Sequence, residues 1–194
     1  MKNIFLIICL LFFTFSIGCG RTPGPAASPS PTQGAPGATN PAGVTPDAVS
    51  SPSVVADEAS LVKAMGSEGT WIIIFTGDFS TTKELVLEGE YTNGKKDDAG
   101  KDIIQRKIAL YTQDDKRNIT NRFTLTAPKL TVTSPMASIQ HGTFKGDLVV
   151  SVDKFQLVDA TVDGNVYFTT ESAKNTFSMD EASKITGKQE VRKD

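Results

Sequence analysis

The sequence contains few of the residues that build metal centres and nucleophilic sites. Its 194 residues include one histidine, His141, and two cysteines, Cys9 and Cys19. That set is too small for a metal site made of histidine and cysteine, and no Gly-x-Ser-x-Gly segment is present to hold a nucleophilic serine. No glycine-rich segment has the lysine and hydroxyl residues of a phosphate-binding loop. The sequence therefore predicts no metal and no cofactor, and it indicates no catalytic residue.

Neither sign of charge is in large excess. Lys and Arg total 20, Asp and Glu total 22, and the formal net charge is −2. The basic residues are spread evenly through the chain, without the basic stripe of a nucleic-acid-binding domain. The charge pattern therefore predicts no nucleic-acid partner and no other strongly charged partner.

The longest apolar run lies at the N-terminus. Lys2 precedes the almost unbroken apolar residues 4–15, and the segment Ser-Ile-Gly at 16–18 leads to Cys19. This run is too short to span a bilayer comfortably, which is typical of a cleaved signal peptide. Residues 16–19 resemble the lipobox of bacterial lipoproteins, in which small residues precede an acylated cysteine. Ser16 departs from that pattern, because the family prefers leucine there.

The lipobox resemblance implies a precursor with a signal peptide at 1–18, cut before Cys19. Lipid on Cys19 would then hold the chain on the extracytoplasmic side of a bacterial membrane, and each buried methylene would contribute about 0.8 kcal/mol. The alternative is an uncleaved N-terminal membrane anchor with an incidental cysteine. If Cys9 leaves with the signal and Cys19 carries lipid, no cysteine remains for a disulfide. The exported domain must then be stabilised by its own core.

A second region, from the lipidated cysteine to residue 55, has the composition of a linker. It contains eight of the ten prolines, many small residues and no aromatic residue. Such a segment cannot bury enough apolar surface to offset its ordering entropy. The sequence therefore predicts a disordered tether over 19–55 and one folded domain over 56–194.

The domain begins with a helix and continues as strands. Asp57 is a suitable N-cap, Leu61, Val62 and Met65 recur at helical spacing, and Gly66 ends the pattern. The apolar run 71–75 predicts a strand buried on both sides. Residues 85–87 and 108–111 predict further strands, and the polar segment 92–98 predicts an excursion that turns at Asn93-Gly94.

The C-terminal half contains a repeat. Residues 142–150 and 160–168 share a pattern of small residue, threonine, apolar, polar, glycine, polar and apolar triplet, 18 residues apart. A weaker copy occupies 183–191, the triplets 155–157 and 177–179 match each other, and 130–132 occupies a similar place before Gly142. The pattern predicts stacked coils of short strands with glycine at a corner. We expect an all-β solenoid of about six coils, and the alternative is a β-sandwich or a small barrel.

The helix, the 71–75 strand, Gly77-Asp78-Phe79 and the irregular coils together resemble a small right-handed parallel β-helix of the pectin-lyase-like type. The corner at residues 162–166 also resembles the coils of bactofilin-like polymer-forming domains. These resemblances imply a fold rather than an activity. Enzymes of the first type work with clustered acidic calcium ligands and a positioned base, and the sequence offers no matching cluster.

Several side chains could still carry chemistry. Asp159 with Asp163, or Asp180 with Glu181, are candidate carboxylate pairs for glycoside hydrolysis, but ordinary surface acids are the favoured interpretation. The same holds for two acidic turns considered as loose calcium sites, at 97–102 and 114–115. His141 is expected to be an exposed turn residue. The aromatic residues considered for stacking on sugars are Tyr91, Tyr111, Tyr167 and Phe168, of which Phe168 is expected in the core.

These observations predict a membrane-anchored cell-envelope lipoprotein whose solenoid is a non-catalytic binding or structural module. Envelope polysaccharide is the ligand class that fold analogy indicates first, and a protein partner is also open. The alternatives are a polysaccharide-cleaving enzyme and a self-assembling envelope protein. A helical lid at one end and the charged segment 188–194 at the other predict a monomer, or at most a dimer.

Overall fold

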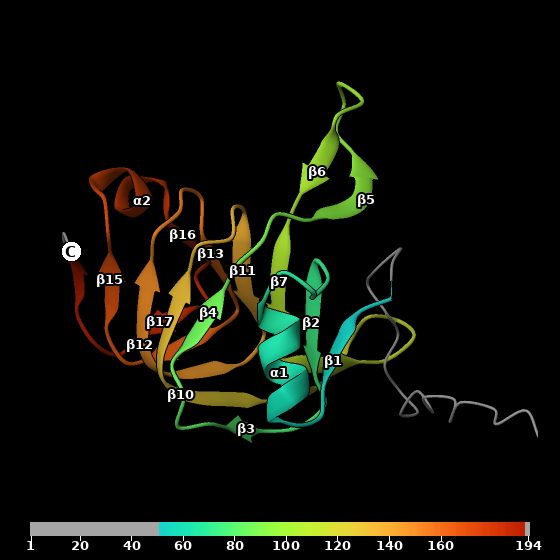
Figure 1. Cartoon of the computed structure of the whole chain (residues 1–194), viewed down its shortest axis with the longest axis horizontal. Coiled ribbons are helices and arrows are strands. Elements are labelled where there is room, and N and C mark those ends of the chain that lie inside the picture. The colour runs from blue at the N-terminus through green and yellow to red at the C-terminus, as the bar shows by residue number, and fades with distance from the viewer. Residues whose placement is uncertain (1–50, 193–194) are drawn as a thin grey trace, which may run out of the picture. The chain divides into compact units, whose positions relative to one another are not determined.

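The computed structural model describes residues 51–192 (Figure 1). The predicted signal peptide, Cys19 and most of the predicted tether lie outside these residues. Regular structure begins with strand β1 (Ser53–Val55), slightly before the predicted domain boundary at residue 56. Between residues 51 and 192, no helix is long and apolar enough to cross a membrane.

Helix α1 (Glu58–Met65) is the predicted N-terminal helix. The Asp57 side chain accepts a hydrogen bond from the Ser60 amide at 2.7 Å, and the Asp57 amide donates to the Ser60 hydroxyl at 2.9 Å. This reciprocal pair satisfies two backbone donors at the helix start. The buried face contains Leu61 and Met65 and belongs to the main core. Val62 was predicted on that face, which is wrong, because its side chain is 53% exposed.

Six parallel strands form the first sheet, here called the first face. Neighbouring strands pair in the order β1, β2 (Ile72–Phe75), β7 (Arg106–Ala109), β11 (Ala137–Gln140), β13 (Gln156–Val158) and β16 (Ser178–Met179). The predicted burial of β2 on both sides is confirmed. Ile73 and Phe75 join the main core, whereas Ile72 and Ile74 join a second apolar cluster on the opposite side.

A second parallel sheet contains two rows of strand pairing, because the long strands β10 (Thr124–Val132) and β12 (Thr143–Val150) belong to both. Their first halves pair with β3 (Phe79–Ser80), β14 (Thr161–Asp163) and β17 (Lys184–Ile185), and this row is the second face. Their last halves pair with β4 (Leu85–Leu87), β15 (Val166–Phe168) and β18 (Gln189–Val191), and this row is the third face.

The predicted repeat coincides with the strand pairing. Thr143 pairs with Thr161 and Val150 pairs with Phe168, so the 18-residue offset read from the sequence is the register of the structure. The weaker copy at 183–191 and the match between 155–157 and 177–179 are also confirmed. Residues 130–132 were expected to hold the same place in the repeat as 155–157, and this is wrong. These residues pair with 148–150, and the counterpart of 155–157 lies in β11.

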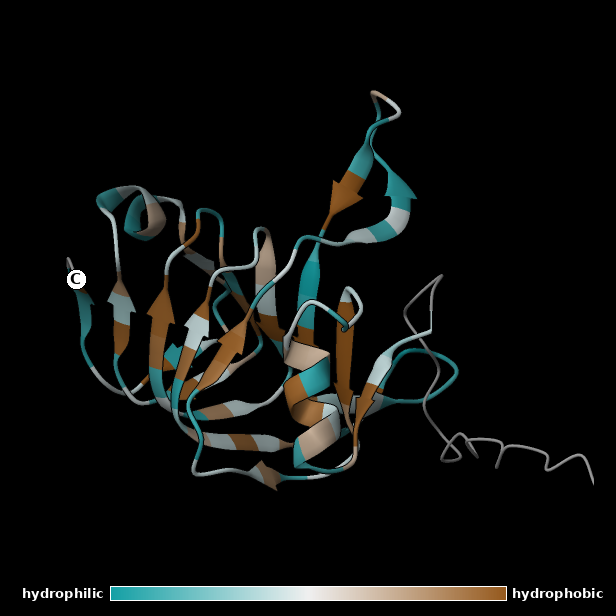
Figure 2. Cartoon of the chain, in the orientation of Figure 1, coloured by the Kyte–Doolittle hydropathy of each residue, from teal (hydrophilic) through white to brown (hydrophobic). Residues whose placement is uncertain are grey.

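Alternation along each strand divides core from surface, since successive side chains point to opposite sides. Leu148 and Val150 are fully buried, as are Leu130 and Val132 on the neighbouring strand. Val149 between them is only half-buried. One continuous core therefore runs through the paired strands, and Figure 2 shows that β2 and the end of β12 are apolar in sequence.

Glycine occupies the predicted corner between the second and third faces for a steric reason. A Cβ atom at Gly164 would collide with the carbonyl oxygen of Gly146, and one at Gly187 would collide with that of Gly164. Gly146 itself also has φ of +142°, which other residues rarely adopt. The corner needs glycine because the backbones of neighbouring repeats approach each other closely there.

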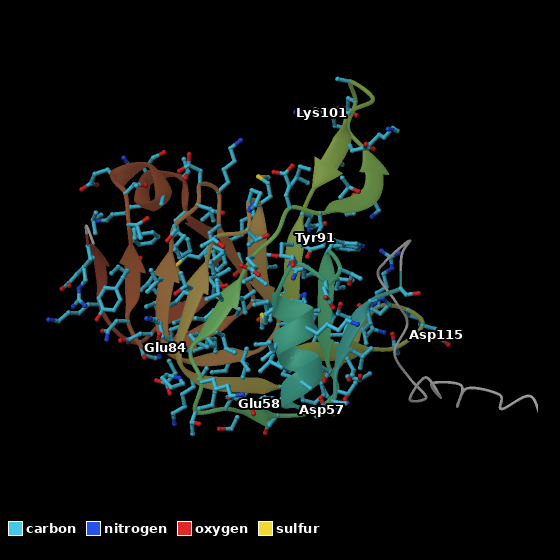
Figure 3. All side chains as sticks on the ribbon, in the orientation of Figure 1. Asp57, Glu58, Glu84, Tyr91, Lys101 and Asp115 are labelled. Atoms are coloured by element: carbon cyan, nitrogen blue, oxygen red, sulfur yellow. The ribbon has the colours of Figure 1, made fainter. Side chains whose placement is uncertain are left out.

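Two antiparallel hairpins extend from the first half of the domain: β5 (Thr92–Lys96) with β6 (Asp102–Ile104), and β8 (Tyr111–Gln113) with β9 (Ile119–Arg122). In the first hairpin, Asn93-Gly94 lies within a strand, and the turn follows Asp97, so the predicted turn position is wrong. Figure 3 shows Lys101 near the hairpin tip and Tyr91 near its base. The strand predicted at 108–111 is likewise divided, between β7 and β8.

A buried arginine joins α1 to the strands. Arg106 is 0% exposed, and its guanidinium donates to the carbonyl oxygens of Ala64 at 2.6 Å, Gly66 at 3.2 Å and Thr70. Its Cζ lies 4.1 Å from the centre of the Tyr91 ring. Burial lowers the pKa of Arg106 from its usual value. The side chain satisfies carbonyl groups at the end of α1, which lack partners within the helix.

The all-β class is therefore confirmed for residues 51–192, together with the helix at the start. Both large sheets are parallel, unlike the antiparallel sheets of an immunoglobulin-type sandwich, and this part of the chain contains no closed barrel. The first face has six strands, and the second and third faces have five each. The sequence did not predict the short helix α2 (Glu171–Thr176) between β15 and β16.

Candidate functional site

The outer side of the third face presents a row of side chains across neighbouring strands. Because Leu148 and Val150 point inward, Val149 points outward. The strand register aligns Val149 with Thr131 on β10 and with Tyr167 on β15. Strands in a sheet lie about 4.8 Å apart, so these three side chains form a short ladder on the surface.

A hollow of about 290 Å³ lies over this ladder. Its volume is near the lower limit of small-molecule sites. The lining is a mixture of hydroxyl groups, charged groups, one aliphatic side chain and one aromatic ring: Lys129, Thr131, Asp147, Val149, Ser151, Tyr167, Thr169 and Arg192.

Contacts among the lining residues hold several of them in place. The Arg192 guanidinium stacks on Tyr167, with Cζ at 3.7 Å from the ring centre. Lys129 forms an ion pair with Glu84 of 2.7 Å between Nζ and Oε2. The Asp147 carboxylate accepts two hydrogen bonds from Asn165, one from the backbone amide at 3.2 Å and one from the side chain at 3.0 Å. The site thus combines an oriented ring with polar groups, as sites that bind polar rings do.

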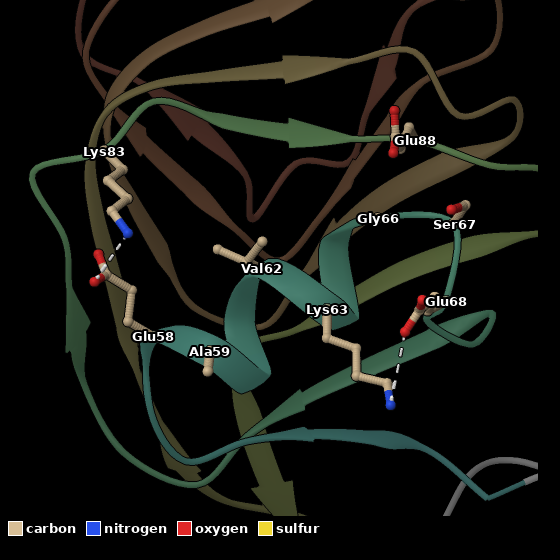
Figure 4. Close-up of a pocket in the computed structure, with 9 residues that line it drawn as sticks. All are labelled: Glu58, Ala59, Val62, Lys63, Gly66, Ser67, Glu68, Lys83 and Glu88. Atoms are coloured by element: carbon tan, nitrogen blue, oxygen red, sulfur yellow. Dashed lines mark ion pairs between the residues drawn. The ribbon is translucent and has the colours of Figure 1, made fainter.

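A larger hollow of about 630 Å³ lies beside α1 (Figure 4). Val62 faces it from the helix, and an ion pair of 3.2 Å between Glu58 and Lys83 bounds one end. A second ion pair, of 3.8 Å, joins Lys63 to Glu68. No aromatic residue lines this hollow. Although it is the larger of the two, the third-face hollow offers more groups that could recognise a ligand.

The carboxylates considered as candidates for glycoside hydrolysis have structural partners. Asp159 accepts hydrogen bonds from Arg122 at 2.5 Å and from the His141 ring at 3.0 Å, and Asp180 accepts from the Asp159 amide at 2.9 Å. We call Arg122, His141, Asp159 and Asp180 the corner cluster. Hydrogen bonds from Arg122 and then His141 lower the pKa of Asp159, and those from Ser183 and the Asp159 amide lower the pKa of Asp180. A catalytic acid requires a raised pKa, so this cluster has the properties of a structural network.

The remaining members of the two candidate pairs also have ordinary surroundings. Asp163 accepts a hydrogen bond from the Thr186 hydroxyl at 3.0 Å, and Glu181 is exposed. The structure therefore brings Asp159 near Asp180, a combination that sequence spacing did not suggest.

His141 was predicted to be an exposed turn residue, and this is wrong in part. Its φ of 59° does place it at a turn, but its side chain is only 23% exposed. The ring contacts Asp159 and meets Tyr111 edge-on, with centres 4.6 Å apart. The residues that cover His141, which are Asp159 and Tyr111, are distant from it in sequence. No local sequence pattern therefore indicated that this turn would be partly buried.

The acidic turns bind their own backbone. Asp97 accepts from the amides of Ala99 and Lys101, and Asp102 forms an ion pair of 2.8 Å with Lys96. Hydrogen bonds from Asn118 lower the pKa of Asp114. Among residues 51–192, no group of three or more His, Cys, Asp and Glu side chains could hold a metal ion.

The four aromatic residues considered for sugar stacking have different positions. Phe168 is 1% exposed in the core, as predicted, and Tyr111 is 7% exposed in the second apolar cluster. Tyr91 stacks on Arg106 and donates to the Gly66 carbonyl. Tyr167 is the one that lines the third-face hollow.

The sequence did not indicate Thr131, Lys129 or Arg192 as site residues. The repeat did contain a signal for Thr131, because it is the central residue of the triplet 130–132 and the central residue of each triplet points outward. Lys129 and Arg192 lie just outside the matched triplets, where no signal was available. Comparison of the chain with protein-family models, curated proteins and solved structures finds no match.

Proposed function

We propose that this chain is a bacterial envelope lipoprotein, lipidated on Cys19, whose domain binds a glycan without cleaving it. The third-face hollow is the proposed binding site. The domain would act on the extracytoplasmic side of the membrane, held there by lipid, with residues 20–52 as a tether.

A right-handed parallel β-helix is part of this proposal. The chain visits the first, second and third faces in a repeating order, and each strand pairs in parallel with its counterpart in the next repeat. Such stacking is typical of solenoids. Parallel crossover connections are right-handed in about 98% of cases, which supports the assignment of hand.

The observation that carries the proposed function is the ladder of Thr131, Val149 and Tyr167 beneath the hollow. An aromatic ring can stack on the apolar face of a sugar, and neighbouring hydroxyl groups can donate to and accept from sugar hydroxyls. The carboxylates of the corner cluster have lowered pKa values, which does not suit either of them to the role of general acid in hydrolysis.

The proposal is tested by retention of the purified protein on insoluble polysaccharides. Tyr167→Ala removes the stacking platform and is expected to weaken binding roughly tenfold. Tyr167→Phe keeps the ring and should retain most of the affinity. Val62→Ala, an exposed change in the α1 hollow, is the matched control and should change nothing. Equal binding by the wild type and Tyr167→Ala would show that the third-face hollow is not the binding site. A loss of binding in Val62→Ala would indicate the hollow beside α1 instead.

Catalysis is tested on the same protein. Incubation with pectin, xylan or peptidoglycan glycans should release no new chain ends, with or without calcium. Steady release that disappears when one acid or base is replaced would establish the rival function, a polysaccharide-cleaving enzyme.

The anchor is tested separately by Cys19→Ala. This change is expected to leave the precursor uncleaved at this site and without lipid, because the modified sulfur is gone. Cells fed a fatty-acid analogue should label the wild-type chain and not the variant. Equal label on both proteins would exclude the lipobox assignment.

A further inference from the structure

The polar groups of the third-face hollow differ in what they already bind. The hydroxyl groups of Thr131, Ser151 and Thr169 have no hydrogen-bond partner among residues 51–192. By contrast, the hydroxyls of Thr133 and Ser134, just beyond β10, donate to the carbonyl oxygens of Leu87 and Gly89. The hollow therefore contains hydroxyl groups that are free to donate and accept, beside others used by the fold.

The charged groups at the hollow are balanced. The lining itself has two cations, Lys129 and Arg192, and one carboxylate, Asp147. Their ion-pair partners add Glu84, Glu190 and Lys188, and the charges of the six side chains sum to zero. Lys129 pairs with Glu84 at 2.7 Å, and Glu190 lies 3.9 Å from Lys188 and 3.7 Å from Arg192. Arg192 is further occupied by the Tyr167 ring.

This balance bears on the ligand, because a site for a polyanion normally has an excess of positive charge. Here an anionic group would have to compete with Glu84 for Lys129 or with Glu190 for Arg192. An uncharged ligand would leave these pairs intact and use the free hydroxyls, each of which both donates and accepts.

Resting on the proposed glycan-binding function, we infer that the ligand is an uncharged, hydroxyl-rich glycan that lies across strands β10, β12 and β15. Its sugar hydroxyls meet Thr131, Ser151 and Thr169, and one ring packs over Val149 and Tyr167. Two strand spacings separate Thr131 from Tyr167, which is about 10 Å, so the site contacts an extended segment rather than one isolated ring.

The test compares neutral and acidic oligosaccharides of matched length on the purified full chain in mild detergent. The probes are cello-oligosaccharides and xylo-oligosaccharides against oligogalacturonates, at about 50 mM and about 300 mM salt. A neutral probe is expected to bind more tightly than the acidic one, with an affinity that changes less than about twofold between the two salt concentrations. Thr131→Val, which removes one free hydroxyl and keeps the side-chain shape, should weaken that binding about fivefold.

Glu84→Gln supplies a test in the opposite direction. This exposed change removes the partner of Lys129 and should raise the affinity for oligogalacturonate severalfold while leaving neutral binding unchanged. Tighter binding of the acidic probe by the wild type, lost in Tyr167→Ala and falling tenfold or more with salt, would overturn the inference and leave glycan binding in place. Failure of every probe to bind would instead count against the proposed function itself.

Discussion

Replacement of Arg106 should separate the effect of its charge from the effect of its shape. The guanidinium satisfies the carbonyl oxygens of Ala64, Gly66 and Thr70 from a fully buried position. Arg106→Met leaves these acceptors without that donor, at about 1–3 kcal/mol for each buried group. It also removes the cost of burying a charge, which offsets part of the loss. We expect a net destabilisation of about 2–4 kcal/mol.

Arg106→Lys should destabilise the domain at least as much, by about 3–5 kcal/mol. Lysine keeps the buried charge, but its single nitrogen cannot span acceptors that the planar guanidinium reaches together. The substitution that preserves charge is therefore expected to be the more damaging one. Lysine resembles arginine more than methionine does, but the positions of the three carbonyl acceptors predict that Arg106→Lys is at least as destabilising as Arg106→Met.

Urea unfolding provides the assay, and the single tryptophan provides the probe. Trp71 is 3% exposed and lies in the neighbouring apolar cluster, so its fluorescence should change on unfolding. Lys83→Met is the control, because its ion pair with Glu58 at the start of α1 is exposed and should contribute less than about 1 kcal/mol. A free energy of unfolding for Arg106→Lys within about 0.5 kcal/mol of wild type would refute the reasoning.

Three further predictions concern the core, pH and assembly. Val150→Asp buries an unpaired carboxylate and should cost several kcal/mol, whereas Val149→Asp on the outer side should cost less than about 1 kcal/mol; melting curves in the reverse order would mean that the faces are misassigned. Arg122 and His141 lower the pKa of Asp159 in the folded protein. Asp159 therefore stabilises the fold fully above its unfolded pKa of about 3.9, and this stabilisation is lost as the pH falls through its folded pKa. Asp159→Asn should flatten the acid limb of a stability–pH curve, and an unchanged limb would contradict this. Light scattering should find a monomer, or at most a dimer, at micromolar concentration. Helix α1 covers one end of the core, and at the other end the last strand has the exposed Gln189 at the position where its neighbour has the buried Val166. Filaments that grow with concentration would favour the self-assembling alternative.

The sequence alone determined the features that depend on local periodicity. The stacked-strand pattern placed Phe168 in the core, where it is 1% exposed, and the 18-residue repeat predicted which residues pair. Asp57 and Gly66 marked the ends of α1 because capping depends on near neighbours. The exposed position of Val62 was missed, since helical spacing defines a broad stripe and the packing of α1 selects its buried part.

Tertiary structure alone decided which distant side chains meet. Arg106 reaches the end of α1 across about forty residues, and His141 meets Asp159 because one repeat stacks on the next. The third-face hollow arises in the same way, from residues on β10, β12 and β15 together with Arg192. Neighbouring strands in these sheets come from successive repeats, so a shift of one residue in their register would change every cross-strand neighbour. Local pattern specifies the direction in which a side chain points, and only the complete stack specifies what it meets there.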